Sequence, residues 1–223
     1  MNEDITIQSL YNLNETIAAA IFEGCTFPWE VLPKIGDFIV ALGNTLSEEE
    51  YEKKGDCIWI AKSAQVFKSA YINGPCIIGK EAQVRHCAFI RGNAIVGEGA
   101  VVGNSTELKN VILFNKVQVP HYNYVGDSIL GYKAHMGAGS ITSNVKSDKK
   151  PIVIKGADAP IETGLKKIGA FLGDEVEIGC GSVLNPGTII GKQSNIYPLS
   201  SVRGFVQARS IYKKQGEIVK KLD

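Results

Sequence analysis

Neither sign of charge dominates this sequence of 223 residues, because 24 Lys and Arg face 23 Asp and Glu and leave a net charge of +1. A chain so balanced has no general attraction for nucleic acid or an anionic membrane surface. Long apolar runs are missing too, since none approaches the roughly 18 residues of a membrane span. The N-terminus, MNEDITIQSL, lacks the basic start and apolar core of an export signal. We therefore expect a cytoplasmic protein without a membrane or nucleic-acid partner.

Cysteine pairs are also missing, because the five cysteines are an odd number and no two of them form a Cys-x-x-Cys motif. Such usage fits a reducing compartment. Histidine is scarcer still, with only His86, His121 and His135 in the whole chain. Their separations of 35 and 14 residues lack the close pair that some metal-binding β-coils use. We therefore predict no metal site.

What the sequence does contain is a six-residue period. An aliphatic or aromatic residue occupies every sixth position of one long stretch: Ile60, Val66, Ile72, Ile78, Val84, Ile90, Val96, Val102, Leu108 and Phe114. An α-helix does not fit this period, because its successive apolar residues would point to different faces. The period is typical of a solenoid of short strands in which three hexapeptides form one turn of about 18 residues.

Small residues follow the large ones at a fixed distance of four positions. They are Ala64, Ala70, Cys76, Ala82, Ala88, Ala94, Ala100 and Thr106. A small side chain is needed where a stacked coil bends, since a bulky group there would clash with the next turn. The two patterns together predict a mainly β fold, a parallel β-helix of hexapeptide repeats.

The period also divides the chain. Residues 1–57 lack it, residues 58–204 carry it, and the basic tail 205–223 lacks it again. It fails between Phe114 and Leu130 and again before Leu172, which predicts loop excursions at 115–129 and 143–169. Helical signals in the first segment predict a small α-helical N-terminal cap that covers the open first coil and hides its strand edge.

One histidine lies where the six-residue rhythm fails. His121 stands in the segment VPHYNYVGD, outside the regular apolar pattern. Imidazole is the side chain best matched to removing a proton at neutral pH. We therefore take His121 as the candidate general base.

Several motifs resemble one family. The runs HYNYVGD at 121–127, GAGSITSN at 137–144 and IGAFLGD at 168–174 are similar to the acetyltransferase domain of bifunctional bacterial GlmU-type enzymes and their archaeal relatives. The segment ETGLKK at 162–167 resembles the archaeal-type sugar-1-phosphate nucleotidyltransferase version. The resemblance covers about residues 58–204.

This resemblance implies a left-handed coil, a homotrimer, and N-acetylation of glucosamine-1-phosphate or galactosamine-1-phosphate by acetyl-CoA. The chain lacks the glycine-rich nucleotide loop and the Rossmann-like domain of the pyrophosphorylase half of that family. Uridylyl transfer is therefore not expected, and a separate nucleotidyltransferase is a candidate partner.

The resemblance also assigns roles. His121 matches the general base, which frees the amino group to attack the thioester carbon. Arg91 and Lys109 match positions that bind the sugar phosphate, Tyr124 matches a sugar-contacting residue, and His135 stands where the family has a sugar-binding Asn. Positions that contact acetyl-CoA are matched by Ala138, Asn144, Val145, Cys180 and Pro198. In the basic tail, Lys213 and Lys214 are candidates to reach the coenzyme phosphates.

Two alternatives remain open. The first is a non-catalytic coil, related to UDP-N-acetylglucosamine pyrophosphorylase, that binds a sugar nucleotide or acts as a scaffold. The second is a metal enzyme of the γ-carbonic-anhydrase type.

Overall fold

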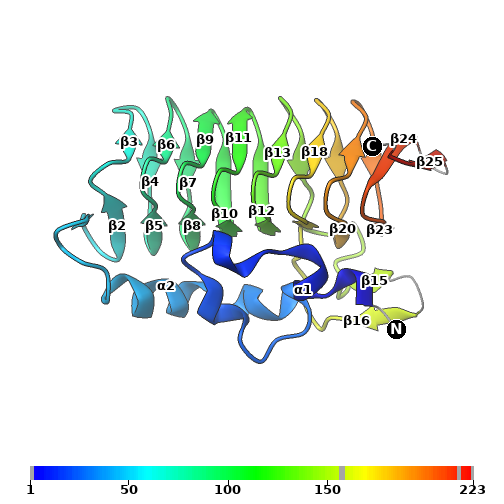
Figure 1. Ribbon diagram of the computed structural model, residues 1–223, viewed down its shortest axis with the longest axis horizontal. Coiled ribbons are helices and arrows are strands. Elements are labelled where there is room, and N and C mark those ends of the chain that lie inside the picture. The colour runs from blue at the N-terminus through cyan, green and yellow to red at the C-terminus, as the bar shows by residue number, and fades with distance from the viewer. Residues whose placement is uncertain (1–2, 156–158, 215–216, 222–223) are drawn as a thin grey trace.

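The computed structural model describes residues 3–155, 159–214 and 217–221. Its body is a left-handed parallel β-helix with three flat faces, seen from the side in Figure 1. Each turn takes 16 to 18 residues where no loop intervenes, as the partners Ile60 and Ile78, Val96 and Leu113, and Ile190 and Val206 show. The predicted fold class is confirmed.

Each face is a ladder of parallel strands. The first face holds β2 (Ile58–Ala61), β5 (Cys76–Ile78), β8 (Ala94–Val96), the end of β10 (Glu107–Leu113), the end of β12 (Tyr124–Leu130), β17 (Ala170–Leu172), β20 (Thr188–Ile190) and β23 (Phe205–Val206). The second holds β3 (Gln65–Val66), β6 (Gln83–Val84), β9 (Val101–Asn104), β11 (Gln118–His121), β13 (His135–Met136), β18 (Glu177–Ile178), β21 (Asn195–Ile196) and β24 (Ser210–Lys214). The third holds β4 (Tyr71–Ile72), β7 (Phe89–Ile90), the starts of β10 and β12, β14 (Ile141–Thr142), β19 (Val183–Leu184) and β22 (Ser201–Val202).

The period-six residues form the inner core of the coil. Ile78, Val84 and Ile90 supply one inward side chain to each face, and all three are fully buried. Stacked turns repeat this arrangement, so that each face gains a continuous inner column of Ile, Val and Leu. The small residues predicted at the bends, such as Ala82 and Ala100, are also fully buried.

The expected loop at 115–129 is wrong. β11 and most of β12 occupy that segment and pair in parallel with strands of the neighbouring turns. The rhythm shortens by one residue at two places instead, because Leu113 follows Leu108, and Leu130 follows Val125, by five positions rather than six. Both shortened steps cross the same corner, so the chain turns there without leaving the coil.

Phe114 is therefore not an inward residue. Leu113 takes that place beside Val96, and Phe114 points outward. Its ring lies 5.1 Å from that of Tyr11 and 5.9 Å from that of Phe22, measured between centroids. Phe114 is fully buried because the N-terminal segment covers it.

That segment, residues 3–46, is here called the N-terminal strap. It contains η1 (Glu3–Ile5), α1 (Ile7–Leu10), η2 (Leu13–Glu15), η3 (Ala19–Phe22), η4 (Pro28–Lys34) and α2 (Ile35–Gly43), where η marks a 3-10 helix. Figure 1 shows the strap running along the length of the coil rather than across its first turn. The expected cap over the open end is therefore wrong. Val66 in the first turn stays 37% exposed, and only β1 (Tyr51–Lys53), antiparallel to β2, covers a first-turn edge.

The strap lies on the first face because that face is apolar outside as well as inside. Its outward residues recur once per turn and are almost completely buried: Trp59, Ile77, Ile95, Ile112, Ile129, Phe171 and Ile189. Gly43 of α2 sits so close to Trp59 that a Cβ atom there would come within 2.4 Å of the indole ring. At the other end of the strap, the rings of Trp29 and Phe171 are 6.1 Å apart. The strap thus buries a second core outside the coil.

The later interruption does leave the coil. Between β14 and β17 the chain forms an antiparallel hairpin of β15 (Val153–Lys155) and β16 (Pro160–Glu162). The expected tail at 205–223 is coil as far as Lys214, since β23 and β24 add parallel strands to β20 and β21. β25 (Glu217–Lys220) then turns back antiparallel to β24. No helix among the described residues is long and apolar enough to cross a membrane.

We expect Trp29→Ala to lower the free energy of unfolding by about 3–5 kcal/mol, because it empties a buried contact between strap and coil. Trp29 is 4% exposed and stacks on Phe27 at 4.6 Å. Urea denaturation measures the change. Tyr71→Ala is the matched aromatic control, since Tyr71 is 62% exposed. Equal losses in the two variants would contradict a strap that holds the first face.

Candidate active site

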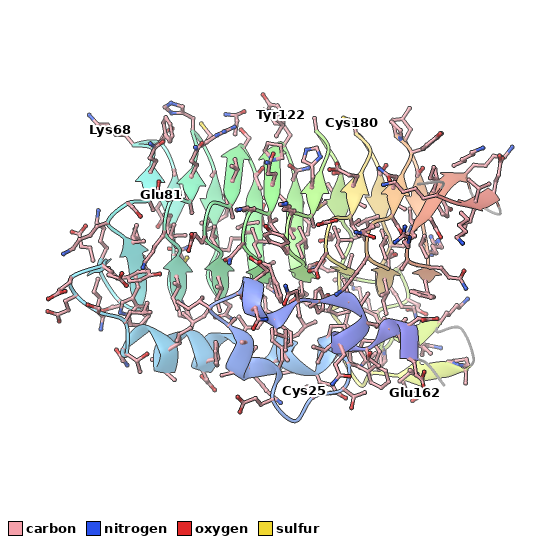
Figure 2. All side chains as sticks on the ribbon, viewed as in Figure 1. Cys25, Lys68, Glu81, Tyr122, Glu162 and Cys180 are labelled. Atoms are coloured by element: carbon pink, nitrogen blue, oxygen red, sulfur yellow. The ribbon has the colours of Figure 1, made fainter. Side chains whose placement is uncertain are left out.

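One long edge of the coil, between the second and third faces, gathers four of the predicted site residues. His121, Ala138, Cys180 and Pro198 occupy equivalent corners of successive turns. Backbone hydrogen bonds link these corners: Gly139 N–H donates to His121 O at 3.0 Å, Gly181 N–H to Ala138 O at 2.8 Å, and Leu199 N–H to Cys180 O at 2.9 Å. We call it the upper edge, and Figure 2 labels Tyr122 and Cys180 along it.

The backbone at His121 is fixed from beneath by a buried amide. Asn123 is 2% exposed, and its Oδ1 accepts from His121 N–H at 3.1 Å. Its Nδ2 donates to Gly137 O at 2.9 Å and to Ser140 O at 3.1 Å, both in the next turn. The His121 residue itself is exposed, and no described residue hydrogen-bonds to its ring. A rigid corner therefore presents an imidazole whose two nitrogens are available to a ligand.

A groove of about 580 Å³ runs along the second face beside this edge. It is lined by His135, Gly137, Glu177, Ile178, Gly179, Cys180, Asn195, Ile196, Tyr197, Pro198, Ile211 and Lys221. The structure thus brings His135, Cys180 and Pro198 together. Gly179 keeps the groove floor low, because a Cβ there would lie 2.4 Å from the backbone nitrogen of Pro198.

His135 occupies this groove and not the third face. Its Nδ1 lies 2.7 Å from Glu177 Oε2, one turn further along the second face. Tyr124, the other predicted sugar contact, lies on the third face. Within one chain the two residues are therefore on opposite sides of the upper edge.

The third face carries a polar cluster built on one buried carboxylate. Asp127 is 3% exposed and accepts four hydrogen bonds: from Lys109 Nζ at 2.8 and 3.1 Å, from Asn110 Nδ2 at 3.0 Å and from Asn144 Nδ2 at 2.6 Å. Asn144 Nδ2 also donates to the Tyr124 hydroxyl at 3.2 Å. Three predicted residues, Lys109, Tyr124 and Asn144, are thus held around Asp127.

The backbone conformation explains how this cluster forms. Asn110 and Asp127 occupy the two shortened corners and have positive φ angles of 55° and 48°. Asn and Asp adopt this left-handed region more readily than other non-glycine residues. The corner geometry stacks their side chains one turn apart, where they hydrogen-bond.

Both predicted phosphate-binding cations already have carboxylate partners. Arg91 Nη1 lies 2.8 Å from Glu107 Oε1, in an exposed pair. Lys109 is held by Asp127. Two cations and two carboxylates leave this region without net charge. Burial raises the pKa of the Tyr124 phenol, and the Asp127 carboxylate raises it further, so the hydroxyl stays protonated at neutral pH.

The remaining predicted residues lie outside both groups. Ala138 is exposed on the upper edge, and Val145, 43% exposed, follows Asn144 on the excursion without lining the groove. Lys214 pairs with Glu217 at 3.1 Å, and Lys213 lies 3.8 Å from the same carboxylate. No three His, Cys, Asp or Glu side chains gather as metal ligands in the part of the chain that the structure describes.

The sequence reasoning missed Asp127, Asn110 and Asn123. Asp127 was within reach, because it ends the motif HYNYVGD and follows Lys109 by 18 residues, about one turn of coil. Asn123 lies in the same motif. Asn110 gave no signal beyond its type, since its role depends on the shortened corner.

The matched region was compared with known proteins. A family model described as the GMPPB C-terminal domain matches residues 72–190, which is more than half of the chain. The protein belongs to the GMPPB C-terminal domain family. This family segment contains the upper edge as far as Cys180 and the whole polar cluster, and it leaves out the N-terminal strap.

Named relatives of this GMPPB C-terminal domain chain agree with the resemblance seen in its motifs. The bifunctional protein GlmU of Methanococcus maripaludis strain C5 is 36% identical over 118 residues, which are 53% of this chain and 28% of the relative. The bifunctional sugar-1-phosphate nucleotidylyltransferase/acetyltransferase of Sulfurisphaera tokodaii is 34% identical over 97 residues, 44% of this chain and 24% of the relative. The matched segment thus spans less than a third of these relatives.

Among solved structures, a mutant of perosamine N-acetyltransferase from Caulobacter crescentus, in complex with CoA and GDP-perosamine, is 17% identical. The match covers 74% of this GMPPB C-terminal domain chain and 57% of that chain, with a TM-score of 0.37.

Proposed function

We propose that this protein transfers the acetyl group of acetyl-CoA to the amino group of an amino-sugar 1-phosphate, glucosamine-1-phosphate or galactosamine-1-phosphate. The observation that carries the proposal is the position of His121. Its free imidazole stands on a rigid edge between the groove of the second face and the polar cluster of the third. The names of the M. maripaludis and S. tokodaii relatives, which match over this segment, support a sugar-phosphate acetyltransferase.

In the proposed reaction His121 acts as general base. Its ring nitrogen takes a proton from the amino group of the sugar, whose lone pair then attacks the thioester carbon of acetyl-CoA. The C–N bond forms, the C–S bond breaks, and the proton passes to the leaving thiolate, so that the products are an N-acetyl sugar and CoA. An exposed ring with no protein partner is free to carry this proton in both directions.

The groove is the proposed site of the coenzyme. Its 580 Å³ lies within the range of small-molecule pockets, roughly 300–1,000 Å³. Cys180 and Pro198 bring it to the upper edge, in line with Ala138 and His121. A thioester arm in the groove would therefore point along the corners toward the imidazole. Lys221 at the far side offers a cation to the coenzyme phosphates.

The polar cluster is the proposed site of the acceptor. Tyr124 keeps its proton and offers a hydroxyl to the sugar, while Asp127 fixes the directions of Lys109 and Asn144. Arg91 belongs to an exposed pair, and such pairs open at little cost. A sugar phosphate would displace Glu107 from Arg91 and gain a guanidinium fork.

We further propose that the active form is a homotrimer in the cytoplasm. Large side chains on the upper edge remain uncovered in a single chain: Leu199 is 85%, Tyr122 is 64% and Tyr197 is 46% exposed. A neighbouring chain packed against this edge would bury them and enclose His121. The second and third faces, which the two ligands need, would then meet across the contact.

The proposal is tested by incubating the purified protein with acetyl-CoA and either amino-sugar 1-phosphate, and by measuring free CoA. We expect CoA release that requires the acceptor and saturates with it. The N-acetylated sugars serve as matched acceptor controls, because they lack the free amine. Release that does not depend on the amine would contradict the proposal and favour a coil that binds a sugar nucleotide without catalysis.

A further inference from the structure

A second pocket lies at the opposite side of the third face. It occupies the edge between the third and first faces, near the C-terminal end of the coil, and has a volume of about 310 Å³. It is lined by Lys146, Ile152, Val153, Lys155, Asn185, Pro186, Gly187, Arg203 and Gly204. None of these residues lines the groove or belongs to the polar cluster. We call it the basic pocket.

The wall of the basic pocket is held in place by packing. Ile152 and Ile154 of the excursion are each 1% exposed. They rest on Gly187, where a Cβ atom would come within 2.9 Å of both side chains. Ile152 N–H donates to Leu165 O at 2.8 Å, and Thr163 Oγ1 donates to Ile152 O at 2.6 Å. The hairpin of β15 and β16, at the lower right of Figure 1, is therefore anchored to the coil and the pocket is preformed.

The charge of the basic pocket has one sign. Three cations line it, Lys146, Lys155 and Arg203, and no acidic residue does. Lys146 has a partner at its rim, since its Nζ lies 3.2 Å from Asp148 Oδ2. Neither Lys155 nor Arg203 forms a salt bridge or a side-chain hydrogen bond with any residue that the structure describes. This differs from the polar cluster, where every cation is paired.

Backbone donors add to the positive character. Gly204 has a φ of +77°, and no described residue accepts a hydrogen bond from the backbone N–H of Gly204 or of Arg203. These two amides belong to the last turn of the third face, where β22 has no further strand beside it. Consecutive free N–H groups beside a guanidinium form a good site for an anion with several oxygens.

We propose that the basic pocket is a second ligand site, separate from the acetyl-transfer site, and that it binds the diphosphate or phosphate group of a nucleotide. Arg203 supplies a planar fork, Lys155 a point charge, and the two amides further donors. The apolar side chains of Ile152, Val153 and Pro186 offer a surface for the attached sugar. A volume of 310 Å³ holds the phosphates and one ring rather than a whole coenzyme.

Isothermal titration of the full-length protein with inorganic pyrophosphate tests this site. We expect saturable binding that Arg203→Gln or Lys155→Gln weakens by about 10–100-fold, as the loss of a charge-assisted hydrogen bond implies. Arg85→Gln on the second face and Lys68→Gln on the first turn remove the same charges elsewhere and are expected to bind within about twofold of the wild type. Pyrophosphate that fails to bind, or that binds all four variants equally, would overturn the proposal.

Further arms locate the anion and its source. Arg91→Gln is expected to leave pyrophosphate binding unchanged, and loss of binding in this variant in place of Arg203→Gln would overturn the proposal by locating the anion at the polar cluster. Competition then identifies the nucleotide. Displacement of pyrophosphate by UDP-N-acetylglucosamine but not by CoA supports a nucleotide-sugar ligand, and the reverse result supports the coenzyme phosphates. Displacement by neither would overturn a nucleotide site.

Discussion

Replacing His121 with alanine is expected to lower the rate of CoA release by about 10²–10⁴-fold, the usual contribution of a general base. The same change is expected to leave the midpoint of thermal unfolding almost unaltered, because the exposed ring has no hydrogen-bond partner among the described residues. Initial rates at saturating acetyl-CoA, with a melting curve for each variant, provide the measurement.

His86→Ala is the matched control for this prediction. His86 also lies at a corner of the upper edge, in an earlier turn, and its Nδ1 lies 2.9 Å from Ser69 Oγ. It is outside both the groove and the polar cluster, so its loss is expected to leave the rate unchanged. A His121→Ala enzyme that works as fast as His86→Ala would remove His121 from the mechanism.

Asp127→Ala is expected to have the second large effect, a loss of about 3 kcal/mol in the free energy of unfolding. The change leaves the Lys109 ammonium and the Asn110 and Asn144 amides without their shared acceptor. The lower end of the range for a broken buried pair applies, because the Lys109 side chain is 28% exposed. Urea denaturation gives the value, and the Michaelis constant for the acceptor is expected to rise.

A double-variant cycle separates the charge from the packing. Lys109→Met in the Asp127→Ala background removes the unpaired cation and is expected to restore part of the lost stability. Glu107→Gln breaks the exposed pair with Arg91 and is expected to change stability little. Asp127→Ala and Glu107→Gln proteins of equal stability would show that the buried carboxylate does not organise the cluster.

The inner core of this coil was predictable because it depends on side chains six positions apart, which any reader of the sequence can count. The outer core was harder to find. Ile77, Ile95, Ile112 and Ile129 recur only once per turn, and nothing in the sequence indicates that the strap will cover them. The strap was misplaced for the same reason: its helices were read as apolar segments without knowledge of the surface that receives them.

The site shows a similar division. His121, Ala138, Cys180 and Pro198 fall on one edge because a motif match places residues at fixed positions in a repeating coil. The state of Lys109 was not predictable, since its partner Asp127 comes from the next turn and reaches it only because both corners are shortened. Charge pairing across turns depends on register, and a one-residue contraction changes register without altering composition.

The strap also limits where ligands and neighbouring chains can act. It covers the outward residues of the first face, as the full burial of Ile95 and Phe171 shows. Only the second and third faces, with the edge between them, remain open along the coil. The proposed groove, acceptor site and trimer contact all lie on these surfaces.

The most direct test of acetyl transfer is the mass of the acceptor after incubation with acetyl-CoA and purified enzyme. The account predicts that glucosamine-1-phosphate or galactosamine-1-phosphate gains one acetyl group on nitrogen with the wild-type protein, and does not with His121→Ala. An acceptor of unchanged mass after complete incubation with the wild-type protein, for both sugars, would contradict it.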